Sequence, residues 1–574
     1  MHTGLEYQAK CRYLPVQLPF ASVVCCCQSG NHLSPPEASP NILIVLLLLF
    51  SISVFPAGAA SAPAVKNMIL LIPDGMSIGR TTLARWYKGG TLLAMDEMAC
   101  DLVRTYSSDA AIADSAPAAT AYSTDFKSHT GYVAVLPDVV NMPGLQPIPK
   151  GDERKPVATI LEAAKLAGKA TGLVVTCEIP HATPAAFSAH YPDRNNYDDI
   201  LEQQVYSGID VVLGGGSKYL TPEARKDRED LIKVIKDLGY DYVTTPEALR
   251  KSTSNKLWGM FAPKDLSYDF DRDPAKQPSL AEMTSKAIEV LSKDKDGFFL
   301  MVEGSKIDWA AHANDPVGVV SDILAFDNAV KVALDFAKKD KHTVVIAVTD
   351  HGNGGITIGD RETSKNYDEL PLSAFIEPLK RAKLTAEGIE KKLNADRSNI
   401  KEVMATYYGI TDLTEAEIKA IKEAKPGKLN YVVGPMISKR AHIGWTTNGH
   451  TGEDVVLYVY SPTGDRPTGV IENTEIAKYM ERVLGLNLQE TTKKLFVPAE
   501  TAFPARGARV EWDDSDPNNP VFVVTRNNDK LKLPVNKNLA EINGKLVKMN
   551  GLTVYNGVAT LPLQQPGFTA VDPC

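Results

Sequence analysis

The sequence has no long basic tract, few cysteines beyond its N-terminal region and few histidines. The first two shortages argue against a nucleic-acid-binding protein and against a disulfide-bonded scaffold. The 574 residues carry a net charge of −8 and no long basic tract, which argues against a general nucleic-acid-binding role. Of seven cysteines, only Cys100, Cys177 and Cys574 lie beyond the N-terminal region, too few and too widely spaced for a disulfide framework. We expect them to be free or partly buried thiols. Only ten histidines are present, so each one in a suggestive setting carries more information than usual.

An apolar run near the N-terminus predicts a secretory signal. It begins at Asn41, continues to Phe55 and meets the small residues 57–62, which are similar to A-x-A cleavage sites. The run is too short for a comfortable membrane span. We therefore expect 1–62 to be an N-terminal extension with a signal peptide, export to the periplasm or the cell exterior, and no stable membrane insertion after cleavage. An uncleaved anchor is the alternative, because the run starts late and no basic cluster directly precedes it.

Between residues 65 and 486, short apolar runs alternate with helical patterns. This alternation predicts an α/β fold, a three-layer sandwich with helices on both faces of a central, mostly parallel sheet. We assign residues 63–500 to this catalytic domain. The expected strands are 68–72, 172–176, 211–213, 298–302, 344–348 and 455–460, and the expected helices are 157–167, 280–292, 317–338 and 473–483.

One charged segment interrupts the alternation. Residues 370–428 are rich in helix formers, and the stretch 414–424 opens like a capping box. We therefore expect a helical cap, or crown, inserted into the domain, although a solvated structural face is the simpler alternative.

The C-terminal residues 506–574 change character. Apolar runs at 521–524, 531–535 and 552–555 are separated by Asn-Gly turns at Asn543 and Asn550. This pattern predicts a small β-rich module, to which we assign no chemistry.

Three of the apolar runs end in residues that can bind metals. The first ends in Asp74, the fourth in Glu303 and the fifth in Asp350-His351. In open α/β sheets, ligands bind outside the carboxyl ends of the strands. We therefore expect a metal-centred active site at this edge of the sheet.

Two further motifs offer metal ligands. Asp308 and His312 are four residues apart, so on a helix they share one face and can grip one ion. An N-terminal acid and an incidental histidine are the alternative. His450 lies in a glycine-flanked loop before an expected strand, where a lone histidine is usually only solvated.

The segment Asp114-Ser115-Ala-Pro117 begins a helix of small residues, with Ser115 at or near the N-cap. A helix N-terminus favours phosphate, because free N–H groups and the helix dipole meet there. A serine at this point can be a nucleophile if a metal lowers its pKa. An ordinary helix cap is the alternative.

Taken together, these motifs resemble the alkaline phosphatase family over residues 67–486. Each motif alone is weak, but their order along the chain is specific. The matching pieces are Pro73-Asp74-Gly75, Asp114-Ser115-Ala116 with Thr120-Ala121, His181 to Ala186 through His190 and Arg194, Glu303 with Asp308 and His312, Thr349 to Gly352, and Gly449 to Glu453.

The resemblance implies a site with two Zn²⁺ and one Mg²⁺. The first zinc would be held by Asp308, His312 and His450, the second by Asp74, Asp350 and His351, and the third ion by Asp74, Thr183 and Glu303. Arg194 would clamp two phosphate oxygens. The implied reaction is hydrolysis of phosphate monoesters at alkaline pH through a phosphoserine on Ser115, and family members are commonly homodimers.

Two residues depart from the best-known bacterial pattern of the family. His181 stands where that pattern has Asp, and Trp309 stands where it has Lys. We expect both to lie around the third metal, where Zn²⁺ or Co²⁺ could then compete with Mg²⁺.

Two rival functions are weighed against this resemblance. A phosphodiesterase or sulfatase of the same superfamily is the nearer one, but the segment after Ser115 lacks the Arg of a sulfatase motif. A non-catalytic, exported phosphate-binding or surface protein is the other. A protein of that class would not need every metal ligand of the family pattern, yet none of these ligands is missing from the sequence.

Overall fold

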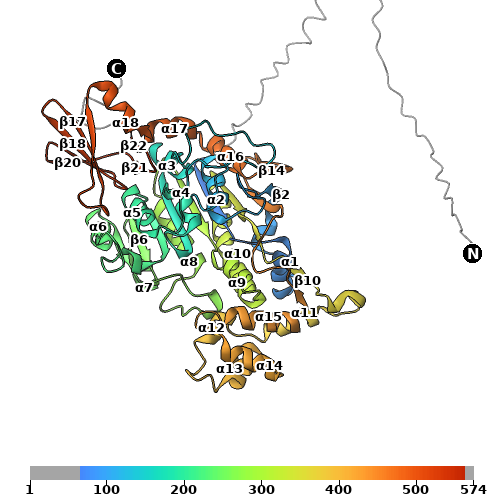
Figure 1. Cartoon of the computed structure of the whole chain (residues 1–574). Coiled ribbons are helices and arrows are strands. Elements are labelled where there is room, and N and C mark those ends of the chain that lie inside the picture. The colour runs from blue at the N-terminus through green and yellow to red at the C-terminus, as the bar shows by residue number, and fades with distance from the viewer. Residues whose placement is uncertain (1–64, 563–574) are drawn as a thin grey trace, which may run out of the picture. The chain divides into compact units, whose positions relative to one another are not determined.

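A ten-stranded sheet forms the centre of the chain in the computed structural model, which describes residues 65–562 (Figure 1). Every strand in it runs parallel to its neighbours except β13, which is antiparallel to both β2 and β8. The order is β14 (Val470–Glu472), β2 (Ala99–Arg104), β13 (Val455–Tyr460), β8 (Thr343–Val348), β1 (Asn67–Ile72), β7 (Phe298–Glu303), β3 (Ala170–Glu178), β4 (Val211–Gly215), β6 (Leu257–Met260) and β5 (Asp241–Val243).

Helices cover both faces of this sheet, because its central strands are apolar on both sides. In β1, Met68 and Leu70 belong to one apolar core and Ile69 and Leu71 to the other, and all four are fully buried. The first core includes α2 (Ser115–Thr124), α3 (Ile160–Leu166), α4 (Ala182–Ser188), α5 (Tyr197–Ser207) and α16 (Thr474–Leu484). The second includes α8 (Leu280–Leu291), α9 (Lys306–His312) and α10 (Pro316–Asp340). The expected three-layer α/β fold is confirmed.

The segment expected to be a helical cap is helical. It contains α11 (Leu372–Lys380), α12 (Ala386–Glu390), α13 (Ile400–Tyr408) and α14 (Glu415–Glu423), and α15 (Asn430–Arg440) extends it beyond the expected end. These helices, which we call the crown, share an apolar core to which Leu83 and the α10 residues Val317 and Val320 also contribute. The capping box is present, since Thr414 and Glu417 exchange side-chain and backbone hydrogen bonds at the start of α14.

The C-terminal residues form mainly antiparallel strands, as expected. A five-stranded sheet contains β16 (Arg509–Asp513), β17 (Val521–Arg526), β18 (Asp529–Pro534), β19 (Leu539–Ile542) and β20 (Lys545–Lys548), and a small second sheet contains β15 (Val497–Pro498), β21 (Val554–Tyr555) and β22 (Ala559–Leu561). We call residues 506–562 the β module.

Only one of the two expected Asn-Gly turns makes a hairpin. Asn543 and Gly544 have φ angles of 50° and 82° and connect β19 to β20, as a tight hairpin turn requires. The second pair, at Asn550, lies in a bend between β20 and β21, which belong to different sheets.

The signal peptide expected in 1–62 lies outside the described residues, as do five of the cysteines. Across residues 65–562, the helices are all too short or too polar to cross a bilayer. Cys100 and Cys177 are free thiols, the first exposed and the second buried.

Candidate active site

Three neighbouring parallel strands end at one edge of the sheet and place acidic residues there. In the order β8, β1 and β7, the first is followed by Asp350 and His351, the second by Asp74, and the third ends in Glu303. The backbone N–H of Gly75 donates to Asp350 Oδ1 at 3.1 Å, which fixes the two turns together. The expected gathering of these residues is therefore present, and all four side chains are fully buried.

Gly75 allows the next element to come close to this edge. Its φ is +69°, and a Cβ at this position would lie 2.5 Å from Asp308 Oδ1. Asp308 and His312 share one face of α9, with His312 Nε2 3.2 Å from Asp308 Oδ2. The short helix after β7 thus adds the expected acid and imidazole to the cluster.

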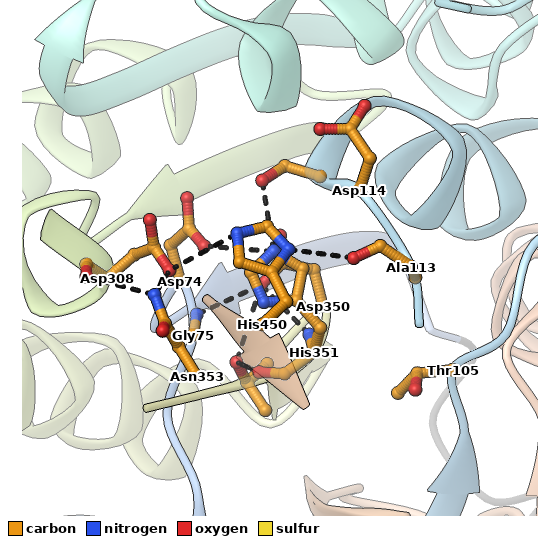
Figure 2. Close-up of polar contacts among 12 residues, drawn as sticks. Asp74, Gly75, Thr105, Ala113, Asp114, Asp308, Asp350, His351, Asn353 and His450 are labelled. Carbon is orange, nitrogen blue, oxygen red and sulfur yellow. Dashed lines mark hydrogen bonds and ion pairs between the residues drawn. The ribbon is translucent and has the colours of Figure 1, made fainter. Parts of the chain in front are cut away.

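His450 reaches the site through a two-residue strand pairing. β12 (His450–Thr451) is antiparallel to β9 (Gly352–Asn353), which directly follows His351. The rings of His450 and His351 lie over one another with centroids 3.6 Å apart (Figure 2). His450 Nδ1 is 2.8 Å from the carbonyl oxygen of Ala113, and Nε2 is 3.8 Å from Asp308. The loop histidine is therefore held in place rather than free in solvent.

Ser115 is the first residue of α2, and Asp114 is the N-cap. The Asp114 carboxylate accepts hydrogen bonds from the N–H groups of Ala116 and Gly131. Ser115 is only 3% exposed, and its Oγ lies 3.1 Å from His351 Nε2. The hydroxyl is thus in contact with the group formed at the strand ends.

Arg194 lies beside this helix start. Its guanidinium binds Asp114 through Nη1, and Nη2 is 3.2 Å from His181 Nε2. Its backbone N–H donates to Gly131 at 2.8 Å. Arg194 is therefore held near Ser115 by its contact with Asp114, the N-cap of the helix that begins at Ser115.

The residues expected around a third metal lie at the start of α4 and the end of β7. Thr183 is fully buried on α4, and His181 is the N-cap of this helix. The His181 ring meets Trp309 edge-on, with centroids 5.8 Å apart. Lys306 Nζ lies 4.8 Å from the Trp309 ring, but this ammonium is buried and paired with Asp265 and Glu387.

Several buried oxygen atoms in the cluster have no hydrogen-bond partner among the described residues. They are both carboxylate oxygens of Asp74, Asp350 Oδ2, Thr183 Oγ1 and Glu303 Oε1. Leaving such atoms unpaired is costly, and a cation is the usual partner of buried carboxylates. Donor atoms of Asp308, His312 and His450 lie within 4.8 Å of one another, as do those of Asp74, Asp308 and His351. The residues therefore fit metal ions.

The pKa values of the buried carboxyl groups also favour bound metal ions. Burial raises the pKa of Asp74 well above its ordinary value, and the carboxylates of Asp350 and Asp308 raise it further. Burial likewise raises the pKa of Glu303 to about 7. Burial also opposes ionisation of Asp308, but the hydrogen bond and charge of His312 hold its pKa below the ordinary range. Bound cations would relieve the crowding of negative charge in this site.

Comparisons with known proteins agree with this geometry. Residues 65–486 match the alkaline phosphatase family, and residues 486–565 match the copper amine oxidase N-terminal domain. Alkaline phosphatase 3 of Bacillus subtilis is 40% identical over 487 residues, covering 79% of this chain and 99% of that protein. The chain belongs to the alkaline phosphatase family. It is accordingly a phosphoric monoester hydrolase that depends on metals.

Solved alkaline phosphatases share the fold. The Thermus thermophilus enzyme is 29% identical, with a TM-score of 0.66, and the match covers 76% of this chain and 96% of that one. The TAB5 enzyme, in a mutant that replaces a histidine by aspartate and has Mg bound in its M3 site, is 26% identical with a TM-score of 0.52, covering 74% of this chain and 99% of that one.

Sequence reasoning missed three residues of this alkaline phosphatase site. Asn353 Nδ2 donates to Asp308 Oδ1 at 2.6 Å, and the buried guanidinium of Arg80 binds the carbonyl oxygen of Asn353. Cys177 Sγ lies 3.4 Å from Glu303 Oε2. Only Cys177 carried a usable signal, because it follows the apolar run of an expected strand in the same way as the acids do.

Proposed function

We propose that this member of the alkaline phosphatase family hydrolyses phosphate monoesters through a phosphoserine on Ser115, fastest at alkaline pH. One observation carries the proposal. Ser115 Oγ lies 3.1 Å from His351 Nε2, and that nitrogen is 3.1 Å from Asp350 Oδ2 and 3.6 Å from Asp74 Oδ1. The hydroxyl thus adjoins the carboxylates that have unpartnered oxygens.

The same residues would hold three metal ions. The first, Zn²⁺, would take Asp308, His312 and His450, the second, Zn²⁺, would take Asp74, Asp350 and His351, and the third, Mg²⁺ or in its place Zn²⁺ or Co²⁺, would take Asp74, Thr183 and Glu303. When bound, such ions lower the pKa of a nucleophilic hydroxyl or water and stabilise attacking and leaving oxygens. His181 and Trp309 would shape the surroundings of the third ion.

Arg194 would bind the phosphate. Its planar fork suits two phosphate oxygens, and the guanidinium now contacts Asp114 and His181. A bound phosphate would take over these contacts. The charge of Arg194 is permanent at working pH, so it offsets the charge of the substrate throughout the reaction.

The reaction would be a double displacement. Ser115 Oγ forms a bond to phosphorus while the ester P–O bond breaks, the serine proton is lost to solvent, and the alcohol leaves after taking up a proton. Water then loses a proton to solvent as it attacks phosphorus from the opposite side, the bond to Ser115 breaks, Ser115 Oγ takes up a proton, and phosphate departs. Unaided hydrolysis of such esters is among the slowest known reactions, so strong electrostatic stabilisation is required.

The proposal also covers the domain boundaries, the export and the oligomeric state of the chain. We take 1–62 as a cleaved extension, 63–500 as the catalytic domain with the crown inserted at 370–428, and 506–574 as the C-terminal module. Export rests on the apolar run at 41–55 followed by small residues. A homodimer rests on likeness to the family alone. N-terminal sequencing of secreted protein and light scattering would test these points.

The decisive experiment replaces Ser115. Acid-quenched wild-type protein incubated with a phosphate monoester should carry phosphoserine at position 115, and Ser115→Ala should carry none. Ser123→Ala is the matched control, because Ser123 is on the same helix and its hydroxyl bonds only backbone oxygens. Labelling that persists in Ser115→Ala would place the nucleophile elsewhere.

Metal removal tests the rest of the site. EDTA should abolish hydrolysis of a chromogenic monoester, and zinc together with magnesium or cobalt should restore it. A matched diester should react far more slowly. Faster diester hydrolysis in the metal-replete protein would favour the phosphodiesterase alternative.

A further inference from the structure

A buried thiol lies among the residues assigned to the third metal. Cys177 is the penultimate residue of β3 and is fully buried, and its Sγ is 3.4 Å from Glu303 Oε2. Donor atoms of Cys177, His181 and Glu303 all lie within 4.8 Å of one another. The neighbouring strand β7 contributes Glu303, so two adjacent strand ends bring sulfur and carboxylate together.

The position of Cys177 is fixed by its surroundings. Its backbone N–H donates to Ser305 Oγ at 3.2 Å, and the N–H of Ser305 donates to Thr176 Oγ1 at 3.0 Å. This reciprocal pair ties the end of β3 to the junction between β7 and α9. The backbone of Cys177 is therefore held beside the end of β7 by buried hydrogen bonds.

Two further buried oxygen atoms near Cys177 have no hydrogen-bond partner within residues 65–562. Thr183 Oγ1 and Glu303 Oε1 belong to fully buried side chains and have no hydrogen-bond partner among the described residues. A thiol is a weak donor and satisfies at most one oxygen of Glu303. A bound cation would satisfy the hydroxyl, the carboxylate and the sulfur together.

We propose that Cys177 is a ligand of the third metal, through Sγ, and that this sulfur makes the site select Zn²⁺ or Co²⁺ over Mg²⁺. Magnesium is bound by oxygen and keeps several waters, whereas thiolate and imidazole suit zinc and cobalt. Ligation forms a sulfur–metal bond and releases the thiol proton to solvent. The inference deepens the proposed function and rests on it, since it concerns an ion of the same site.

Cys177 is better placed than His181 to bind this ion. Arg194 donates to His181 Nε2, so a neutral ring carries its proton on Nδ1 while that contact lasts. His181 could bind a metal only after Arg194 moves to the phosphate. Cys177 Sγ instead contacts Glu303, the carboxylate that would share the ion.

The test compares Cys177→Ser and Cys177→Ala with Cys100→Ser, which removes an exposed thiol on β2. Cobalt-loaded protein should show a near-ultraviolet thiolate-to-cobalt band in the wild type and in Cys100→Ser. Difference spectra between the wild type and each Cys177 variant isolate Cys177, because every other cysteine is common to that pair. We expect this band to vanish in both Cys177 variants, and zinc affinity at one site to fall about 10–100-fold.

Metal analysis after dialysis against zinc with excess magnesium completes the test. The wild type should hold zinc in all three sites, and Cys177→Ser should exchange about one equivalent of zinc for magnesium. An unchanged cobalt spectrum or unchanged metal content in Cys177→Ser would overturn the inference. Phosphoserine at Ser115 is scored separately, so absence of labelling in the wild type would count against the proposed function and not against the thiol ligand. If Cys177→Ala fails to fold, Cys177→Ser still decides.

Discussion

Arg80 is a buried cation directly behind the candidate metal ligands. Its side chain has no exposed surface, and Nη2 donates to the backbone oxygen of Asn353, whose amide in turn donates to Asp308. Burial lowers the pKa of Arg80 to about 10, against the opposing charges of Asp308 and Glu453. The guanidinium thus stays charged, and it orients a metal ligand through one intermediate residue.

Arg80→Met should weaken metal binding and also lower stability. The new side chain fills the space, but it leaves Asp308 and Glu453 without the cation that faces them, and removing one side of a buried charge arrangement is destabilising. Metal affinity is therefore compared on protein shown to be folded by circular dichroism. Residues that orient metal ligands typically contribute about 10–100-fold to metal affinity or activity. We expect a loss of that size in zinc affinity and in kcat/KM. Arg85→Met, on the same helix but paired with Asp96, is the control. Equal metal affinity in the two variants would show that Arg80 is only structural.

Asp322 makes stability depend on pH at a point away from the metals. Burial raises its pKa to about 7, although Lys306 opposes the shift. When the pKa of an aspartate is higher in the folded than in the unfolded protein, its contribution to stability is fully present below the unfolded pKa. This contribution is lost as pH rises through the folded pKa. Asp322 therefore loses its stabilising contribution between about pH 4, near the unfolded pKa, and pH 7, the folded pKa.

Asp322→Asn should therefore stabilise the protein more at pH 8.5 than at pH 5.5, by about 2 kcal/mol. Asparagine keeps an acceptor for the backbone N–H of Asp269 and for the hydroxyl of Ser321. Thermal unfolding of metal-saturated protein at the two pH values measures the difference. Asp335→Asn, an exposed change on the same helix, should show little pH dependence. The same shift at both pH values for Asp322→Asn would contradict the pKa assignment.

Among the elements, the start of α10 fixes the crown to the catalytic domain. Asp315, the N-cap of α10, is fully surrounded by protein and accepts hydrogen bonds from the Tyr408 hydroxyl at 2.8 Å and the Ala386 N–H at 2.9 Å. Tyr408 ends α13, and Ala386 begins α12. Because α10 follows α9 after three residues, the crown is tied close to the helix that presents Asp308 and His312.

Tyr408→Phe should loosen this attachment. It removes a hydroxyl from a buried carboxylate and should cost about 1–3 kcal/mol, because the hydrogen bond is to a charged group. We expect a lower thermal midpoint and faster hydrogen exchange in α12 and α13. Tyr407→Phe, on the same helix and only half-buried, should change neither quantity measurably. Equal effects of the two variants would show that the Asp315 contact does not hold the crown.

Strand ends and helix faces could be predicted from the sequence, but pairings over long distances could not. Continuous apolar runs predicted β1, β7 and β8 within one or two residues, and a four-residue spacing placed Asp308 and His312 on one face. β2 and β14 were missed, because β14 is a three-residue strand at the edge of the sheet and β2, beside it, is half-exposed and has no continuous apolar run. The two-residue ladder that seats His450 beside Asn353 leaves no periodic pattern. Arg80 was missed for the same reason, since nothing in a helical pattern shows what a lone arginine will face.

At the scale of the whole molecule, the β module is joined to the catalytic domain by buried polar contacts. Asn536 donates to Asp199 and Glu202 of α5 at 2.9 and 3.0 Å. Lys537 Nζ lies 3.2 Å from Glu202 and 3.0 Å from Glu229. Burial raises the pKa of Glu202 to about 8, with Lys537 opposing the shift. The module thus supplies the cation that these two carboxylates face.

Lys537→Met tests whether this cation holds the module in place. The substitution keeps the apolar stem but leaves Glu202 and Glu229 facing each other without the cation between them. Breaking a buried pair from one side costs about 3–5 kcal/mol, and partial exposure of Lys537 and Glu229 reduces this to about 1–3 kcal/mol. We expect faster hydrogen exchange in β18 to β20 and easier proteolysis between 498 and 508, with kcat changed less than about twofold, since Ser115 and its surroundings are not touched.

Lys532→Met is the matched control, because Lys532 pairs with Glu541 inside the module and is more exposed. It should leave exchange at the junction unchanged. The pH dependence separates charge from packing. Below pH 6, Glu202 is protonated in both proteins, since its pKa is about 8, so the difference between wild type and Lys537→Met should shrink there and widen towards pH 9. A difference that does not vary with pH would mean that the lysine stem, rather than its charge, attaches the module.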